Sequence, residues 1–68
     1  MSVAKVIEIT STSAKSFEDA IEKGIVKADK TLHNIEGAWI KEQKVEVSNG
    51  KIEAYRVNML VTFILDDN

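Results

Sequence analysis

The last strand-like segment of the chain, residues 55–65, has more apolar side chains than a protein of 68 residues can bury alone. Its odd positions form an unbroken apolar row: Tyr55, Val57, Met59, Val61, Phe63 and Leu65. Because side chains alternate between the two faces of a strand, this row predicts a face turned toward a core. The even positions mix small, polar and apolar groups: Ala54, Arg56, Asn58, Leu60, Thr62 and Ile64. Such a mixture is unusual for a sheet face that meets only water. We therefore expect the second face to meet other subunits or a ligand.

Size and composition limit how such a chain can be stabilised. Residues 1–68 form a single domain, close to the size below which one hydrophobic core no longer offsets chain entropy. The absence of cysteine excludes disulfides, and a single histidine, His33, argues against a zinc cluster. Nine basic and eleven acidic residues give a net charge of -2, and their mixed order predicts no surface for nucleic acid. We expect oligomerisation to supply the missing stability.

The sequence also gives no sign of export or membrane insertion. The segment 1–5 is not followed by an apolar run with a cleavage site, and no stretch reaches the roughly 20 apolar residues that span a bilayer. We expect a soluble cytoplasmic protein that contacts no membrane.

The first half of the chain predicts a strand followed by a helix. Residues 3–10 are rich in β-branched side chains, and apolar residues then recur at steps of three and four over residues 17–35. Ser13 or Ser16 can cap the start of this helix. Gly24 lies in its apolar stripe, where glycine costs about 1 kcal/mol in helix propensity relative to alanine. Close approach of the sheet backbone would compensate that cost.

The second half predicts a β-hairpin. Residues 38–47 form the next strand, with Trp39 at its beginning, and Asn49-Gly50 is a strong hairpin signal between two β-rich runs. The order is thus β-α-β-β, an α+β fold in which one helix packs on one face of a three-stranded antiparallel sheet. The other face has no element left to cover it, so we expect a closed homo-oligomer.

Two residues are the main candidates for ligand binding. Trp39, the only tryptophan, either packs in a core or interface or offers a stacking surface to a planar ligand. Arg56 is the one strong charge in the middle of the last strand. It either forms an ion pair, exposed or between subunits, or donates hydrogen bonds to a ring carbonyl or a phosphate.

The remaining polar residues do not indicate catalysis. His33 is most simply a polar residue at the helix end, and no serine has the context of a nucleophile. The carboxylates Glu42, Glu46 and Glu53 alternate with lysines, as on a solvated face. A symmetric assembly could still gather Glu46 side chains around a cation. We expect a protein that is not an enzyme.

Taken together, these residues resemble the dodecin family of small flavin-binding proteins. The resemblance rests on the element order, on Trp39 and on three stretches of sequence: 5–9 (Lys-Val-Ile-Glu-Ile), Thr12-Ser13 before Ser16-Phe17, and 55–66 from Tyr-Arg-Val to the aspartate Asp66. The resemblance covers almost the whole chain. No single motif is specific to the family, but the combination of element order, Trp39 and these stretches is.

The resemblance implies a hollow homododecamer with helices outside and flavins, FMN or riboflavin, held in pairs between subunits. Each flavin ring would stack against Trp39, and Gln43 and Glu46 of the hairpin would lie among the ligand contacts. Members of the family commonly have a glutamine after the tyrosine of the last strand, whereas this chain has Arg56, and its hairpin is shorter. The implied role is flavin storage and sequestration that limits photochemical damage.

Two alternatives to flavin storage remain open at the level of sequence. The chain could be a structural or coenzyme A-binding oligomeric module in which Trp39 only packs an interface. It could also be a flavin-dependent enzyme, although it has no glycine-rich nicotinamide fingerprint.

Overall fold

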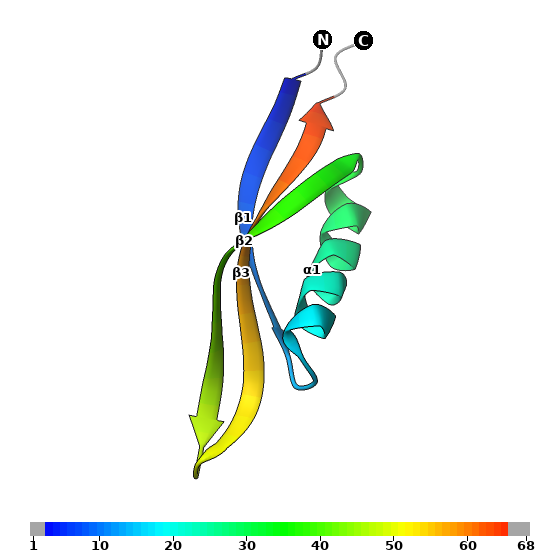
Figure 1. Cartoon of the computed structure of the whole chain (residues 1–68). Coiled ribbons are helices and arrows are strands. Elements are labelled where there is room, and N and C mark those ends of the chain that lie inside the picture. The colour runs from blue at the N-terminus through cyan, green and yellow to red at the C-terminus, as the bar shows by residue number, and fades with distance from the viewer. Residues whose placement is uncertain (1–2, 66–68) are drawn as a thin grey trace.

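The computed structural model describes residues 3–65, so Asp66 of the terminal pattern lies outside the described residues. The elements are β1 (Val3–Ser13), α1 (Phe17–Leu32), β2 (Ile35–Ser48) and β3 (Lys51–Leu65). The strands form one antiparallel sheet in the order β1-β3-β2, and α1 lies along one face of it (Figure 1). The predicted β-α-β-β order and the antiparallel sheet are therefore confirmed. β1 continues past its predicted end at Thr10 to Ser13, which pairs with Tyr55.

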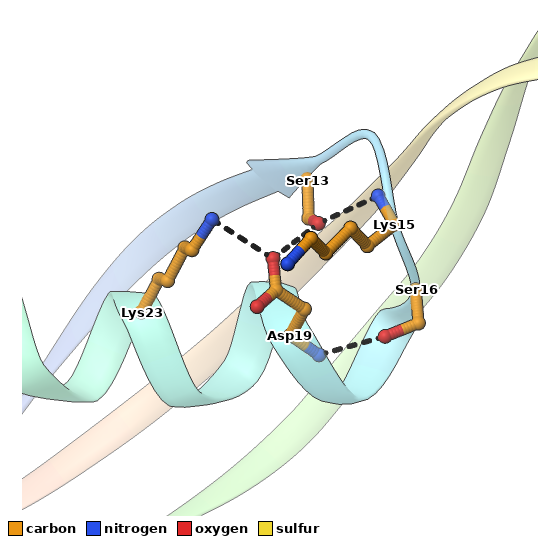
Figure 2. A network of polar contacts seen from close by, with 5 residues as sticks. All are labelled: Ser13, Lys15, Ser16, Asp19 and Lys23. Carbon is orange, nitrogen blue, oxygen red and sulfur yellow. Dashed lines mark hydrogen bonds and ion pairs between the residues drawn. The ribbon is translucent and has the colours of Figure 1, made fainter.

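A polar network fixes the start of α1 (Figure 2). Ser16 is the N-cap: its hydroxyl accepts a hydrogen bond of 3.0 Å from the Asp19 backbone N–H. Ser13 instead donates to the Asp19 carboxylate at 2.6 Å and accepts from the Lys15 backbone N–H at 2.9 Å. The Ser13 hydroxyl, followed by Lys23 at 3.1 Å, holds the pKa of Asp19 below its usual value. Ser16 thus caps the helix, and Ser13 stabilises the turn that precedes it.

The helix ends earlier than its apolar spacing predicts. It stops at Leu32, and His33 and Asn34 have φ of 59° and 53°, in the left-handed region that turns the chain back toward the sheet. Ile35, which the spacing assigned to the helix, is the first residue of β2. Consequently β2 begins before residue 38, and Trp39 lies inside the strand and not at its head. The apolar spacing extended the helix too far because Ile35 follows Leu32 by three residues, the same interval that separates apolar residues along a helix, although Ile35 belongs to the next strand.

The core lies between α1 and the odd face of β3. Ala20 and three β3 residues, Val57, Met59 and Val61, are completely buried. Ile7 and Ile9 of β1, Phe17, Ile21 and Ile25 of α1 and Ile35 of β2 pack around them. This confirms that the odd row of the last strand faces the core.

Gly24 allows α1 to approach the sheet, but the close neighbours are side chains and not backbone atoms. A Cβ at Gly24 would lie 2.5 Å from Met59 Cε and 3.0 Å from Ser11 Cβ. The cost of glycine in helix propensity is therefore offset by the room that Gly24 leaves for the side chain of the buried Met59.

The helix α1 covers only part of the sheet face on which it packs, and the end of the β2–β3 hairpin extends beyond the helix (Figure 1). Asn49 and Gly50, with φ of 53° and 76°, form the predicted tight turn at its tip. The radius of gyration is 14.0 Å, whereas a compact domain of this length has about 11 Å. Val45, Val47 and Ile52 near the tip remain exposed. The protomer alone therefore leaves apolar surface uncovered, as expected for a subunit of an assembly.

Candidate ligand site on the uncovered sheet face

The face of the sheet opposite α1, called here the open face, places residues of all three strands in rows. Directly paired residues of antiparallel strands share a face. The register therefore gives three adjacent rows: Glu8, Leu60 and Trp39; Thr10, Asn58 and Glu42; Thr12, Arg56 and Lys44. Neighbouring rows are about 7 Å apart along the strand, two residues at about 3.4 Å each.

Trp39 is not part of the protomer core. It is 52% exposed, and its row partner Leu60 is half-buried. Together the two form an apolar surface on the open face. The core-packing alternative for Trp39 is therefore excluded within one protomer, while a subunit interface and a ligand both remain as partners.

Arg56 forms an ion pair with Glu46 of the same chain. The two side chains are 38% and 42% exposed, so water weakens the pair. The pair leaves Arg56 Nε buried and without a hydrogen-bond partner among residues 3–65. Four residues along β3 separate Arg56 from Leu60, the row partner of Trp39, which is about 14 Å. Trp39 and Arg56 of one chain thus do not stack on opposite faces of one ring.

Gln43 lies on the opposite face of the sheet from Trp39. It pairs with Val57 and therefore lies on the helix side of the sheet, where α1 does not reach it. Simple alternation from Trp39 would place Gln43 on the open face. A β-bulge between Ile40 and Glu42 inserts one residue and inverts the alternation. Of the four predicted ligand residues, the structure thus places Trp39, Arg56 and Glu46 on the open face and Gln43 on the other.

A second polar group on the open face was not singled out from the sequence. Asn58 Nδ2 donates to Glu8 Oε2 at 2.9 Å, and Lys41 Nζ lies 3.5 Å from the same oxygen. The hydrogen bond from Asn58, and then the charge of Lys41, hold the pKa of Glu8 below its usual value. The only sequence signal was Asn58 itself, a polar residue in the mixed even row of the last strand.

Between these groups lies a pocket of about 150 Å³, lined by Thr10, Glu42, Lys44, Arg56 and Asn58. Two of its lining residues have buried polar atoms without a partner among residues 3–65: Arg56 Nε, a donor, and Asn58 Oδ1, an acceptor. Since Asn58 is one row from Trp39, the open face combines an apolar stacking surface with an adjacent polar pocket. This arrangement suits a flat ring with a hydrogen-bonding edge.

Within residues 3–65, no three histidine, cysteine or acidic side chains gather closely enough to hold a metal ion. In the same part of the chain, α1 is too short and too polar to cross a bilayer, and no other helix is present.

Comparison with known proteins identifies the family to which this fold belongs. A family model described as Dodecin matches residues 3–66. The curated dodecin of Thermus thermophilus is 29% identical over 65 residues, covering 96% of this chain and 94% of its own. A Mycobacterium tuberculosis protein named calcium dodecin is 41% identical over 64 residues, covering 93% and 89%. The solved structure of the dodecin from Streptomyces davaonensis superposes with a TM-score of 0.92 at 33% identity, covering 97% of both chains.

These matches extend over nearly the whole chain and agree with the element order and sheet described above. The chain belongs to the dodecin family.

Proposed function

We propose that this protein is a cytoplasmic flavin-binding storage and sequestration protein that catalyses no reaction. It assembles as a hollow homododecamer and stacks the isoalloxazine ring of FMN or riboflavin on Trp39 at sites between subunits. The observation that supports this most strongly is the half-exposed Trp39 beside Leu60, on a sheet face that no helix or strand within residues 3–65 covers. An indole offers a planar ring a matching apolar surface at low entropy cost.

The shape of the protomer supports the assembly. Its accessible surface is 4998 Å², whereas a folded monomer of this mass exposes about 4300 Å². The excess is consistent with the uncovered hairpin and open face. The site is therefore expected to be complete only where subunits meet.

Stacking also supports a protective role. A ring held against an indole can lose its excitation before photochemistry occurs. The photobleaching of bound riboflavin is expected to be slower than that of free riboflavin.

The alternative is a structural or coenzyme A-binding oligomer without flavin. The name of the Mycobacterium tuberculosis relative raises calcium as a further ligand. In this chain, however, the carboxylate of Glu46 is already paired with Arg56, which opposes a cation site built from Glu46 alone.

Titration of the ligand-free protein with riboflavin and FMN, followed by quenching of flavin and tryptophan emission, tests the proposal. Trp39→Ala should weaken binding by about 1–3 kcal/mol, the contribution of one aromatic stack, and light scattering should still give about twelve times the chain mass of 7.6 kDa. Val26→Ala is the matched control, because Val26 is 59% exposed on α1, away from the open face.

Two results would contradict the proposal. Native protein that ignores both flavins would leave the structural or coenzyme A-binding alternative. Flavin affinity unchanged by Trp39→Ala would show that the tryptophan only packs an interface.

A further inference from the structure

The side-chain amide of Asn58 has a defined orientation. Its neighbour Glu8 is a carboxylate whose pKa lies below the usual value, so at neutral pH this group can only accept hydrogen bonds. The Nδ2 group must therefore face Glu8, as the 2.9 Å contact shows. The Oδ1 atom is left as a buried acceptor that has no partner among residues 3–65.

Arg56 is constrained in a similar way. Its Nη2 group is engaged with Glu46, and its Nε is a buried donor without a partner in the described chain. Arg56 and Asn58 are two residues apart on β3, on the same face, and both line the 150 Å³ pocket. Buried polar atoms without a partner are costly, so this pocket should take a group that satisfies a donor and an acceptor together.

The charges around the pocket favour a neutral group. Glu46 offsets the charge of Arg56, and the pocket lining includes both Glu42 and Lys44. An anion such as phosphate would also face the Oδ1 atom of Asn58. An imide, in which an N–H lies next to a carbonyl, offers the required donor and acceptor without net charge.

We propose that Asn58 determines ligand specificity by accepting a hydrogen bond at Oδ1 from the imide N–H of a planar ring that stacks on Trp39 of the same chain. Arg56 Nε donates to the neighbouring ring carbonyl, and Glu8 positions the Asn58 amide. The rows of Trp39 and Asn58 are about 7 Å apart, a distance that a fused tricyclic ring covers. This inference rests on the proposed flavin-binding function and assigns the residues that read the edge of the ring.

The experiment compares lumiflavin, which has the imide N–H and no side chain, with N3-methyllumiflavin, in which a methyl group replaces that hydrogen. Affinities are measured on the assembled protein by quenching of flavin emission. Native protein should bind lumiflavin at least about 10-fold more tightly, because the methylated ring leaves buried polar groups unpaired. This comparison needs no variant.

Asn58→Leu should weaken lumiflavin binding while leaving N3-methyllumiflavin nearly unchanged, so that the ratio of affinities approaches one. Thr62→Val is the matched control, since Thr62 lies on the same face of β3 on the other side of Leu60. This control should preserve the ratio.

The outcomes separate this inference from the function on which it rests. Failure of native protein to bind lumiflavin, riboflavin and FMN alike would overturn both. Equal binding of the two rings by native protein would overturn the role of Asn58 and leave flavin binding intact. If Asn58→Leu keeps the native ratio of the lumiflavin and N3-methyllumiflavin affinities, the role of Asn58 is likewise overturned while flavin binding stands. A ratio lost only because the variant binds the methylated ring more tightly would show that Asn58 limits space, which also overturns the proposed hydrogen bond.

Discussion

Replacing Gly24 by alanine tests how closely α1 packs on the sheet. Alanine should gain about 1 kcal/mol in helix propensity over glycine. The new Cβ would, however, lie 2.5 Å from Met59 Cε and 3.0 Å from Ser11 Cβ. Met59 is completely buried, so we expect a shift of its methyl group to disturb the packing of the core. Overpacking of this kind typically costs about 1–3 kcal/mol, and we expect Gly24→Ala to destabilise the protein by about 1 kcal/mol net.

The assay is thermal unfolding at a fixed protein concentration, because the stability of an oligomer depends on concentration. Gly37→Ala is the control: apart from its chain neighbours, no atom of residues 3–65 lies within 4 Å of the Cβ position at Gly37, and its φ is not positive. Met59→Leu removes the offending Cε atom, and in that background Gly24→Ala should become neutral or stabilising. A Gly24→Ala variant that is more stable than the native protein would refute the packing argument.

Two further variants test the polar groups. Glu46→Gln removes the carboxylate that offsets the charge of Arg56, so binding of FMN should strengthen a few-fold relative to riboflavin. This gain should shrink as the salt concentration is raised. If the ratio of the FMN and riboflavin affinities equals the native ratio and does not change with salt, Arg56 does not influence the ligand phosphate. Asp19→Asn should lower the melting temperature at neutral pH, because the lowered pKa of Asp19 means that its carboxylate stabilises the folded state above the usual aspartate pKa of about 3.9. That stabilisation is lost as pH falls through the lowered pKa, so native and variant melting temperatures should converge in acid, and a constant difference across the pH range would contradict the role of Asp19.

The features of the fold that depend on local sequence could be predicted. Asn49-Gly50 determines a two-residue hairpin turn by its left-handed backbone, and both residues have positive φ. The odd row of β3 identified the core face because alternation holds along an uninterrupted strand. The three- and four-residue spacing located α1, although it could not show that Ile35 belongs to the following strand.

The candidate site was predictable only in part, because it depends on register between strands. Trp39 and Arg56 were found from their residue types alone. The face on which Gln43 lies could not be read from alternation, because a bulge after Ile40 changes which residues share a face. The contact between Asn58 and Glu8 joins residues 50 positions apart in the chain, and no local pattern indicates it.

The open face has to serve two purposes, and its composition follows from both. Leu60 and the half-exposed Trp39 gain free energy by leaving water, whether against a ring or against another subunit. Arg56 and Asn58 each have a buried polar atom without a partner among residues 3–65, and these atoms would be costly in a dry apolar interface. A ligand that is flat and apolar over Trp39 and polar at one edge satisfies both sets of groups. If such a ligand lies where subunits meet, linkage requires that it stabilise the assembly to the same extent that the assembly strengthens its binding.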